Sequence, residues 1–458
     1  MSTIPLAGRS VRLAFVTAAL SVSTACTPPA GAQVSPRFAS ADALIQDSLR
    51  QIGDRAVLAV VGPEGVRHIR AFGPVAATDA VPIASATKWF SAAVAMTLVD
   101  RGEWSLQTLV SQHFPDAPAG VRAATVRQLF SHTAGIRLQP PCLTDARTTL
   151  QACAAEILAL PLLGRPGAAF AYGGGSMQIA AAMAERATGQ TWAALFEARI
   201  AGPLGMTRTT YGRPANPWVG GGASSSAPDY ARFLQMLLLR GIAPPGTPAA
   251  GQRILSEASV DAMLADQRAG APVAFSPFTR FAGTDPDLAA EPGYGIGVWR
   301  QRFDAGGELL RASSPGAFGF TPWLDVRTRT AGVLLVESTG EDVFPTALEL
   351  ERRVEAGNAA FVSAEGGGGS PAEARIEAPR PNPAARGAVF RIVLPAAGHV
   401  RVDVFDVRGR RVAGGADGER PSGEYDVAVD VSALAGGVDV AVLRVDGRVA
   451  GRQRLVVR

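Results

Sequence analysis

A serine and a lysine, Ser85 and Lys88, stand three residues apart in the run Ser85-Ala86-Thr87-Lys88. Lys88 is the only lysine among the 44 lysine and arginine residues of the chain. An arginine guanidinium stays protonated in proteins, whereas a buried lysine amine can lose its proton and act as a base. If a helix begins near Ser85, residues three apart share one face and the amine lies beside the hydroxyl. The pair therefore predicts a serine nucleophile activated by a lysine base.

The residues after Lys88 predict a lowered pKa for its amine. The side chains of Trp89, Phe90 and Val94 would bury the amine, and the positive end of the helix also disfavours the ammonium. Backbone N–H groups at the same helix end can stabilise an oxyanion. The tetrapeptide S-x-x-K is common by itself, and its weight here comes from the sole lysine that occupies it.

A tyrosine, Tyr172, lies in a glycine-rich turn before an expected helix, in the run Ala171-Tyr172-Gly173-Gly174-Gly175. A phenol beside the serine and lysine would carry the proton to the leaving group. The alternative is that the tyrosine simply caps a loop, as tyrosines next to glycine often do.

The segment Ser313–Phe320 lies between two strand-like runs and contains Pro315. Proline in a strand requires an edge, because it has no N–H to donate to a neighbouring strand. Amides two residues apart point the same way, so the missing N–H of Pro315 and the N–H of Ala317 face the same side. If that side is an open cleft, the proline is harmless and Ala317 can donate to a ligand.

Apolar patterns predict an α/β fold of two lobes, a sheet and a helical insertion. We expect helices at residues 41–52 and 89–99, a hairpin at 56–61 and 68–72, and strands at 295–299, 309–314 and 330–338.

Together these residues resemble the penicillin-recognising serine hydrolases, a superfamily of class C β-lactamases, D,D-peptidases and related esterases, over roughly residues 41–338. Further matches to its motifs are the runs Gln128–Ile136, Pro203–Met206 and Gly221–Ala227, the last followed by Asp229. The resemblance implies a β-lactamase-like sandwich of an antiparallel sheet and a helical lobe, with no metal and no cofactor. It also implies that Ser85 is the nucleophile, Lys88 its base and Tyr172 a second acid or base. The oxyanion hole would be the N–H groups of Ser85 and Ala317, and His132 would be structural.

Two departures from the family pattern fall at the expected substrate-binding positions Gly174, Ser314 and Gly316. Gly174 replaces the asparagine of Y-x-N, and Ser314-Pro315-Gly316 replaces K-T-G or H-x-G. Each lost contact to the amide or carboxylate of a β-lactam should cost roughly 1 to 3 kcal/mol. We therefore expect an esterase or amide hydrolase acting on a small ester, amide or peptidoglycan-like molecule. The alternatives are a β-lactamase or D,D-peptidase, and a non-catalytic protein that binds penicillin or cell-wall fragments.

Composition excludes several other classes of protein. The 458 residues are 47% hydrophobic and 18% charged, which excludes a disordered chain, a collagen-like fibre and a disulfide-knot miniprotein. The arginines form no block of five or six, so we expect no nucleic-acid partner, and no apolar run is long enough for a transmembrane span. Four histidines form no H-E-x-x-H motif, and G-x-S-x-G and phosphate-binding motifs are absent from the sequence.

The first 32 residues have the order of a secretory signal peptide: Arg9 and Arg12, an apolar stretch at 13–25, then small residues. We expect cleavage after Ala32, with lipidation of Cys26 as the alternative. Either route exports the protein to the periplasm, the outer cell surface or the medium. Cys142 and Cys153 would then be free to form a disulfide, and two buried thiols are the other interpretation.

The sequence predicts three segments after the signal peptide: a hydrolase domain at 40–360, a Gly/Ser-rich linker at 361–375 and an all-β module at 376–458. Short alternating strands indicate a β-sandwich in the last segment. The sandwich resembles the Ig-like domains of type IX sorting signals and flagellar hook-capping proteins. The matching residues are the runs Pro381–Pro383, Val404–Arg410 and Arg454–Arg458. This resemblance implies secretion machinery or the cell surface as a partner, and a structural appendage is the alternative.

Overall fold

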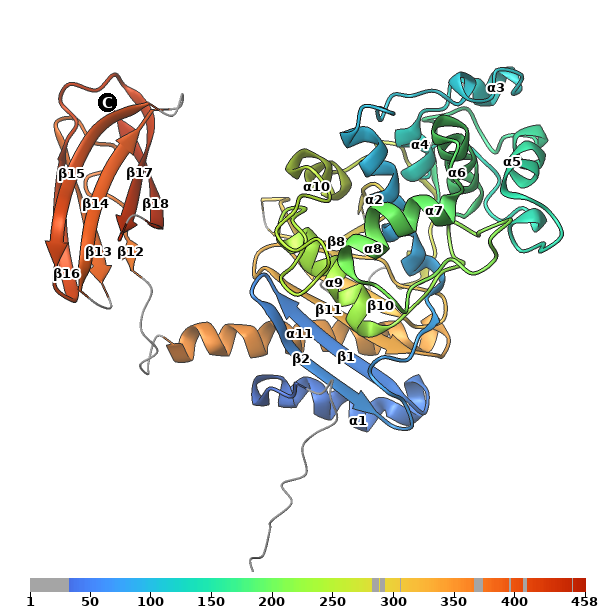
Figure 1. The fold of residues 1–458 in the computed structure, drawn as a ribbon, viewed down its shortest axis with the longest axis horizontal. Helices are drawn as coiled ribbons and strands as arrows, with labels where there is room; N and C mark the ends of the chain where they lie inside the picture. The colour runs from blue at the N-terminus through green and yellow to red at the C-terminus, as the bar shows by residue number, and fades with distance from the viewer. Residues whose placement is uncertain are drawn as a thin grey trace, which may run out of the picture. The chain divides into compact units, whose positions relative to one another are not determined.

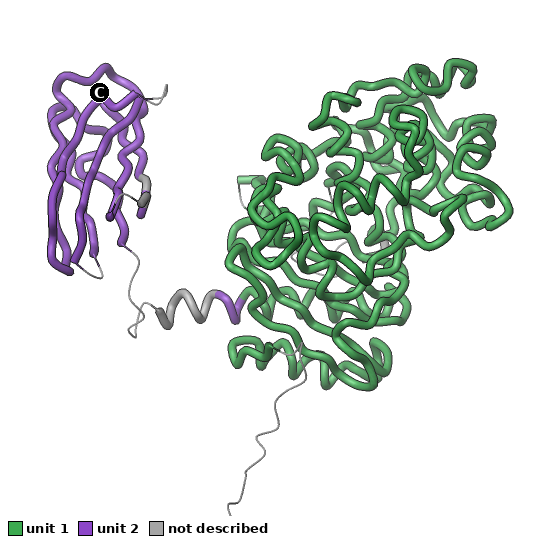
Figure 2. The backbone as a smooth tube through the Cα atoms, viewed as in Figure 1, with its two compact units in different colours: residues 1–355 green, residues 356–458 purple. Residues whose placement is uncertain are grey.

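The computed structural model describes residues 33–281, 288, 293–304, 306–365, 374–394, 397–406, 410–446 and 448–458. The expected signal peptide, including Cys26, and most of the expected linker lie outside the described residues. The chain divides into two compact units, residues 1–355 and residues 356–458 (Figure 2). Within the described ranges, none of the helices combines the length and apolarity that a membrane crossing needs.

The first unit contains a sheet of strands and a lobe of short helices. Its α-helices are α1 Ala39–Ile52, α2 Thr87–Asp100, α3 Ala119–Arg122, α4 Val126–Phe130, α5 Leu150–Ala159, α6 Gly175–Thr188, α7 Trp192–Phe196, α8 Gly202–Leu204, α9 Ala227–Leu238, α10 Glu257–Leu264 and α11 Gly340–Glu365, which extends past the unit boundary. Its strands are β1 Ala56–Gly62, β2 Gly65–Phe72, β3 Val81–Pro82, β4 Phe170–Ala171, β5 Ser224–Ser225, β6 Val273–Phe275, β7 Gly293–Tyr294, β8 Trp299–Phe303, β9 Leu309–Ser313, β10 Thr321–Asp325 and β11 Thr330–Val336.

The main sheet has seven strands in the order β2-β1-β11-β10-β9-β8-β7, and each neighbouring pair is antiparallel. The helical lobe is therefore inserted between β1 and β11, which pair directly with Ala56 opposite Val336. Strand β1 is apolar on both faces because both are covered. Alternate residues pack against α1 and α11 on one face and against the helical lobe on the other (Figure 1).

Most of the expected elements are present, but the expected strand at 295–299 is wrong. Residues 295–298 form the turn of a hairpin, in which Gly295 N–H donates to Val298 O at 2.9 Å, and β8 begins only at Trp299. Gly297 has φ +72°, and a Cβ there would lie 2.6 Å from the Lys88 carbonyl oxygen. The turn thus approaches helix α2 more closely than any residue with a side chain allows.

Strand β10 is not among the expected strands. Pro322 lies within it, but the pairing of β10 with β9 begins at Trp323, opposite Ser313, so the missing N–H of Pro322 falls beyond the end of β9.

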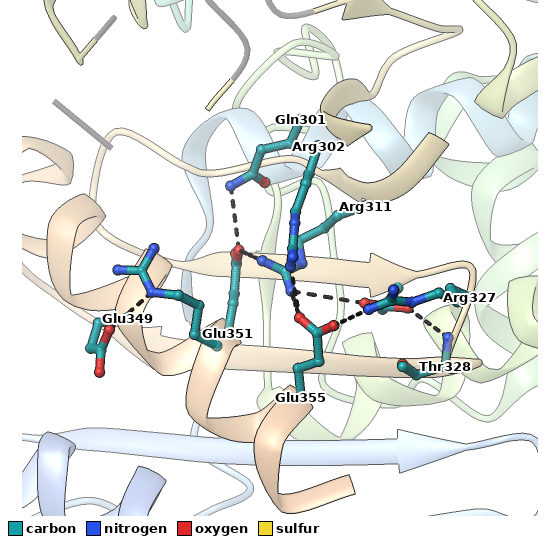
Figure 3. Close-up of polar contacts among 10 residues, drawn as sticks. Gln301, Arg302, Arg311, Arg327, Thr328, Glu349, Glu351 and Glu355 are labelled. Atoms are coloured by element: carbon teal, nitrogen blue, oxygen red, sulfur yellow. Dashed lines mark hydrogen bonds and ion pairs between the residues drawn. The ribbon is translucent and has the colours of Figure 1, made fainter. Parts of the chain in front are cut away.

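A buried cluster of charges holds helix α11 against the sheet (Figure 3). Arg311 on β9 donates to Glu351 at 2.9 Å and to Glu355 at 3.2 Å, and its side chain is only 2% exposed. Burial raises the pKa of Glu351 to about 7, against the opposing effect of the Arg311 charge. Arg302 and Arg327 add ion pairs to Glu355. Because a buried ion pair needs both partners, the cluster fixes α11 in one register on the sheet.

The second unit contains two sheets that enclose an apolar core. Their orders are β12-β13-β16 and β15-β14-β17-β18. The strands are β12 Arg375–Ile376, β13 Gly387–Leu394, β14 Gly398–Phe405, β15 Arg411–Arg420, β16 Gly423–Asp430, β17 Gly437–Val445 and β18 Arg448–Val457. This unit is therefore an all-β sandwich with alternating buried residues, as the period-2 pattern predicted.

We predict that Arg311→Ala lowers the free energy of unfolding of the first unit by about 3 to 5 kcal/mol, because Glu351 would stay buried without the charge that opposes it. All six tryptophans lie in the first unit, so their fluorescence in a urea titration reports this unit alone. Arg147→Ala, which removes an exposed pair with Asp145, is the control and should leave the midpoint unchanged. Replacing Arg311 by Met and Glu351 by Leu together should restore most of the loss. Equal midpoints for the two single variants would contradict the role given to the cluster.

Candidate active site

The turn before helix α2 presents Ser85 in an unusual backbone conformation. Ala84 has φ +45°, a left-handed value that costs free energy for a residue with a Cβ. A 3-10 turn at Ala84–Ala86 then leads into α2, which begins at Thr87. The turn is held from the side by Ile83, whose N–H donates to the Ala223 carbonyl at 3.0 Å. Ser85 therefore stands at the start of a helix on a backbone that its surroundings keep strained.

Lys88 lies one turn after Ser85, with its Nζ 3.1 Å from the Ser85 Oγ. The Nζ also donates to the Gly220 carbonyl at 2.6 Å and lies 4.6 Å from the centre of the Tyr172 ring. The side chain is buried, and burial lowers the pKa of Lys88 to about 7. In the described part of the chain, no carboxylate pairs with this amine. About half of the Lys88 amines are therefore neutral at pH 7, as a base requires.

The segment that receives the Lys88 amine is itself held by α2 and α6. Ser91 donates to the Val219 carbonyl at 2.7 Å, and the Val219 N–H donates to Gln178 at 3.2 Å. The Ala223 N–H donates to Thr87 at 3.1 Å. These bonds fix the Gly220 carbonyl at one distance from α2. The sequence analysis did not identify the Gly220 carbonyl as an acceptor, because every residue has a backbone carbonyl and the sequence does not show which one faces Lys88.

Tyr172 follows the short strand β4, which pairs in parallel with β6. Its N–H donates to the Phe275 carbonyl at 3.1 Å, so the backbone of Tyr172 is tied to β6. Burial raises the pKa of Tyr172 to about 12, while hydrogen bonds with the Ser85 and Trp299 side chains act in the opposite direction. The phenol thus keeps its proton at neutral pH and is a donor there.

In the loop after β9, the N–H groups of two alternate residues are bonded to the segment around the start of β10. Ser314 N–H and Gly316 N–H donate to the carbonyls of Pro322 and Phe320, at 3.2 and 2.8 Å. Pro315 and Ala317, on the alternate register, face the other side and line the pocket with Ser85. A Cβ on Gly316 would lie 2.3 Å from the Ile83 carbonyl oxygen, so only glycine lets the loop approach the Ser85 turn.

Two of the three expected substrate-binding residues are not at the pocket surface. The Ser314 hydroxyl is used internally, because it donates to the Ser85 carbonyl at 3.2 Å. Gly174 is covered, since a Cβ there would lie 2.8 Å from Trp218 Nε1. Gly316 alone of the three lines the pocket. The room that the family's asparagine would need is therefore filled by an indole.

His132 lies behind Tyr172, with φ +57° and a buried side chain. Its ring nitrogens are 3.1 Å from the Tyr294 hydroxyl and 3.4 Å from the Ser176 hydroxyl. Burial, and then the Lys88 charge, lower the pKa of His132 well below its usual value, so the ring is neutral. The ring centres of His132 and Tyr172 are 4.8 Å apart, and the histidine supports the tyrosine by packing.

The pocket beside Ser85 has a volume of ≈ 320 Å³ and a mainly apolar lining that includes several aromatic rings. The lining side chains missed by sequence reasoning are Leu138, Gln139, Phe275, Pro277, Phe278, Phe281, Trp299 and Phe344. Three of these are phenylalanines spaced three residues apart at 275, 278 and 281, which is a sequence signal that we did not use.

The structure joins Cys142 and Cys153 by a disulfide, with Cα atoms 5.3 Å apart. The bond links the 3-10 turn Pro141–Leu143 to α5, and Cys142 lies three residues after Gln139. Among the residues that the structure describes, no group of three or more His, Cys, Asp or Glu side chains is arranged to hold a metal ion.

The chain is similar in sequence and in structure to several known proteins. The family model described as Beta-lactamase matches residues 42–356. Penicillin-binding protein 4 of Amycolatopsis lactamdurans is 31% identical over 248 residues, which are 45% of this chain and 61% of that protein. Esterase EstB of Burkholderia gladioli is 28% identical over 193 residues, which are 36% of this chain and 49% of that protein. A solved beta-lactamase-family structure from Bacteroides dorei DSM 17855 is 33% identical to this chain, with a TM-score of 0.59. The match covers 66% of this chain and 90% of the chain in that structure.

We predict that the rate at which a fluorophosphonate probe labels Ser85 rises about tenfold per pH unit below pH 7 and levels off above it. The sign follows from the pKa of Lys88, about 7, because only the neutral amine can take the serine proton. Lys88→Arg should abolish labelling, since a guanidinium keeps its proton. Ser105→Ala, at an exposed serine, is the control and should label like the wild type. A rate independent of pH between 5 and 8 would show that Lys88 is not the base.

Proposed function

Because the chain belongs to the beta-lactamase family, whose members are serine hydrolases, we propose that it cleaves carboxylic esters through an acyl-enzyme on Ser85. The observation that carries the proposal is the buried Lys88 amine, bonded to the Ser85 hydroxyl and paired with no carboxylate in the described part of the chain. Such an amine is a base at neutral pH, and it is already bonded to the serine hydroxyl whose proton it would take.

The first half of the reaction acylates Ser85. The Ser85 oxygen attacks the acyl carbon while its proton passes to the neutral Lys88 amine. The carbonyl oxygen becomes an oxyanion and accepts the N–H groups of Ser85 and Ala317. The carbon–oxygen bond of the ester then breaks, and the leaving oxygen takes the phenol proton of Tyr172. Lys88 returns its proton to Tyr172, and both residues regain their starting states.

The second half frees the acid. A water molecule attacks the acyl carbon, and its proton passes to Lys88. When the bond to Ser85 breaks, the serine oxygen takes that proton back. The proton that leaves Ser85 in the first half, and the proton that leaves water in the second, are thus both taken by Lys88.

An ester is favoured over a β-lactam because the polar groups that would hold a β-lactam are missing. The indole of Trp218 fills the room beside Gly174, and no charged side chain lines the described part of the pocket. The likeness to a penicillin-binding protein keeps β-lactamase or D,D-peptidase activity as the second candidate function, with amide hydrolysis by the same steps. A protein that binds penicillin or cell-wall fragments without turnover is the remaining alternative.

We also propose that the protein is exported and that the second unit is an Ig-like sorting or attachment module. The signal-like order of residues 1–32 and the disulfide between Cys142 and Cys153 support export, since disulfides persist in oxidising compartments. The two-sheet sandwich supports an Ig-like module.

We predict that the mature protein releases p-nitrophenol from p-nitrophenyl butyrate. Ser85→Ala should reduce turnover to the background rate, and Lys88→Arg should lower kcat/KM by about 10²- to 10⁴-fold, the usual contribution of a general base. Tyr172→Phe should lower kcat for ethyl butyrate by about 10²-fold or more, and for p-nitrophenyl butyrate by much less, because p-nitrophenolate leaves without taking a proton. Equal activity in the wild type and Ser85→Ala would mean that another residue is the nucleophile.

We predict that kcat/KM for benzylpenicillin is about 30-fold or more below that for p-nitrophenyl butyrate, because two contacts are lost and each is worth at least about 1 kcal/mol. Gly174→Asn alone should not raise penicillin turnover, since the new side chain would meet the Trp218 indole. A penicillinase rate near the diffusion limit would overturn the preference for esters.

A further inference from the structure

Four aromatic side chains form one continuous wall of the pocket, here called the aromatic wall: Trp299, Phe278, Phe281 and Phe344. Ring centres lie 4.8 Å apart for Phe278 and Trp299, 4.7 Å for Phe278 and Phe344, and 4.9 Å for Phe281 and Phe344. These are the separations of favourable aromatic pairs. The wall is therefore assembled from three elements that are far apart in the sequence: β8, the segment after β6, and α11.

The aromatic wall begins at Tyr172. The ring centres of Tyr172 and Trp299 are 4.9 Å apart. The wall then runs from Trp299 through Phe278 to Phe344. In the proposed reaction the leaving oxygen must come within hydrogen-bonding distance of the Tyr172 hydroxyl. The part of the ester attached to that oxygen therefore lies against the aromatic wall.

The chemistry of the wall limits what can bind there. No charged side chain lines the described part of the pocket, so a carboxylate or ammonium would lose water without gaining a partner. Phe344 is held in place, because α11 is fixed to the sheet by Arg311 and its first residue, Gly340, donates its N–H to the Ala317 carbonyl at 2.8 Å. A flat ring gains edge-to-face contacts with such a wall beyond those of an alkyl group of similar size.

We propose that the aromatic wall binds the alcohol part of the ester and selects an uncharged aryl or arylalkyl alcohol, with Phe278 and Phe344 as specificity-determining residues. The proposal rests on the proposed function, because it uses the role of Tyr172 as donor to the leaving oxygen. It goes further than the proposed function by stating that the protein selects the alcohol part of the ester rather than the acyl part.

The test compares two isomeric esters, benzyl acetate and methyl phenylacetate, which carry the same phenyl group on opposite sides of the ester bond. Acid release is followed by titration at constant pH. The wild type should show a kcat/KM for benzyl acetate on the order of tenfold or more above that for methyl phenylacetate, the factor expected for burying one phenyl ring. Cyclohexylmethyl acetate should be slower than benzyl acetate by about 2- to 12-fold.

The variants assign the preference to the wall. Phe278→Leu and Phe344→Leu should each lower the ratio of kcat/KM for benzyl acetate to that for ethyl acetate by several-fold, because leucine keeps the site apolar and removes the ring. Phe114→Leu is the matched control, since Phe114 is a buried phenylalanine outside the pocket, and should not change the ratio of the two substrates.

Three results separate the proposal from the proposed function. A preference for methyl phenylacetate, or equal rates for the isomers in a Ser85-dependent reaction, overturns the proposal and leaves the esterase standing. Unchanged selectivity in both wall variants also overturns it. Hydrolysis of no ester by the wild type, or equal hydrolysis by Ser85→Ala, overturns the proposed function and with it this inference.

Discussion

The site depends on one interaction, a lysine amine that is buried without an opposing charge. Burial makes the ammonium form of Lys88 costly, and among the described residues no carboxylate pairs with it, so the pKa of Lys88 is lowered to about 7. The surroundings preserve that state. The Gly220 carbonyl takes one N–H of Lys88, and the segment around it is bonded to Thr87 and Ser91 on the same helix. A carboxylate in place of that carbonyl would hold the proton on Lys88 and remove the base.

The sheet fixes the positions of several residues that line the pocket. Helix α11 supplies Gly340 and Phe344 to the pocket, and its buried glutamates are bonded to Arg311 on β9. The loop that follows β9 carries Ala317 toward Ser85. One strand thus fixes both the helix that shapes the pocket and the backbone amide expected to stabilise the oxyanion. Short loops on a rigid sheet can hold such groups to within fractions of an ångström, which electrostatic stabilisation needs.

The sequence predicts the contact between Ser85 and Lys88 better than the residues around it. Ser85 and Lys88 are neighbours on a helix, and one-turn spacing is local information that sequence carries directly. The same holds for the hairpin at 56–72 and for the register of Pro315 and Ala317. The aromatic wall joins residues 278, 299 and 344, which only the tertiary fold brings together. The expected strand at 295–299 is wrong because residues 295–298 turn against α2, where Ile296 and Val298 are buried as they would be in a strand.

The pairing of β1 with β11 also affects the order in which the chain can fold. Two adjacent inner strands of the sheet are the first and the last described strands of the first unit, with the whole helical lobe between them in the sequence. During synthesis from the N-terminus, the β1–β2 hairpin emerges early and has no partner until β11 follows. Closing so long a loop makes the final pairing slow compared with local helix formation. The nascent chain therefore spends most of its synthesis with an open sheet edge that chaperones can bind and that later residues must close.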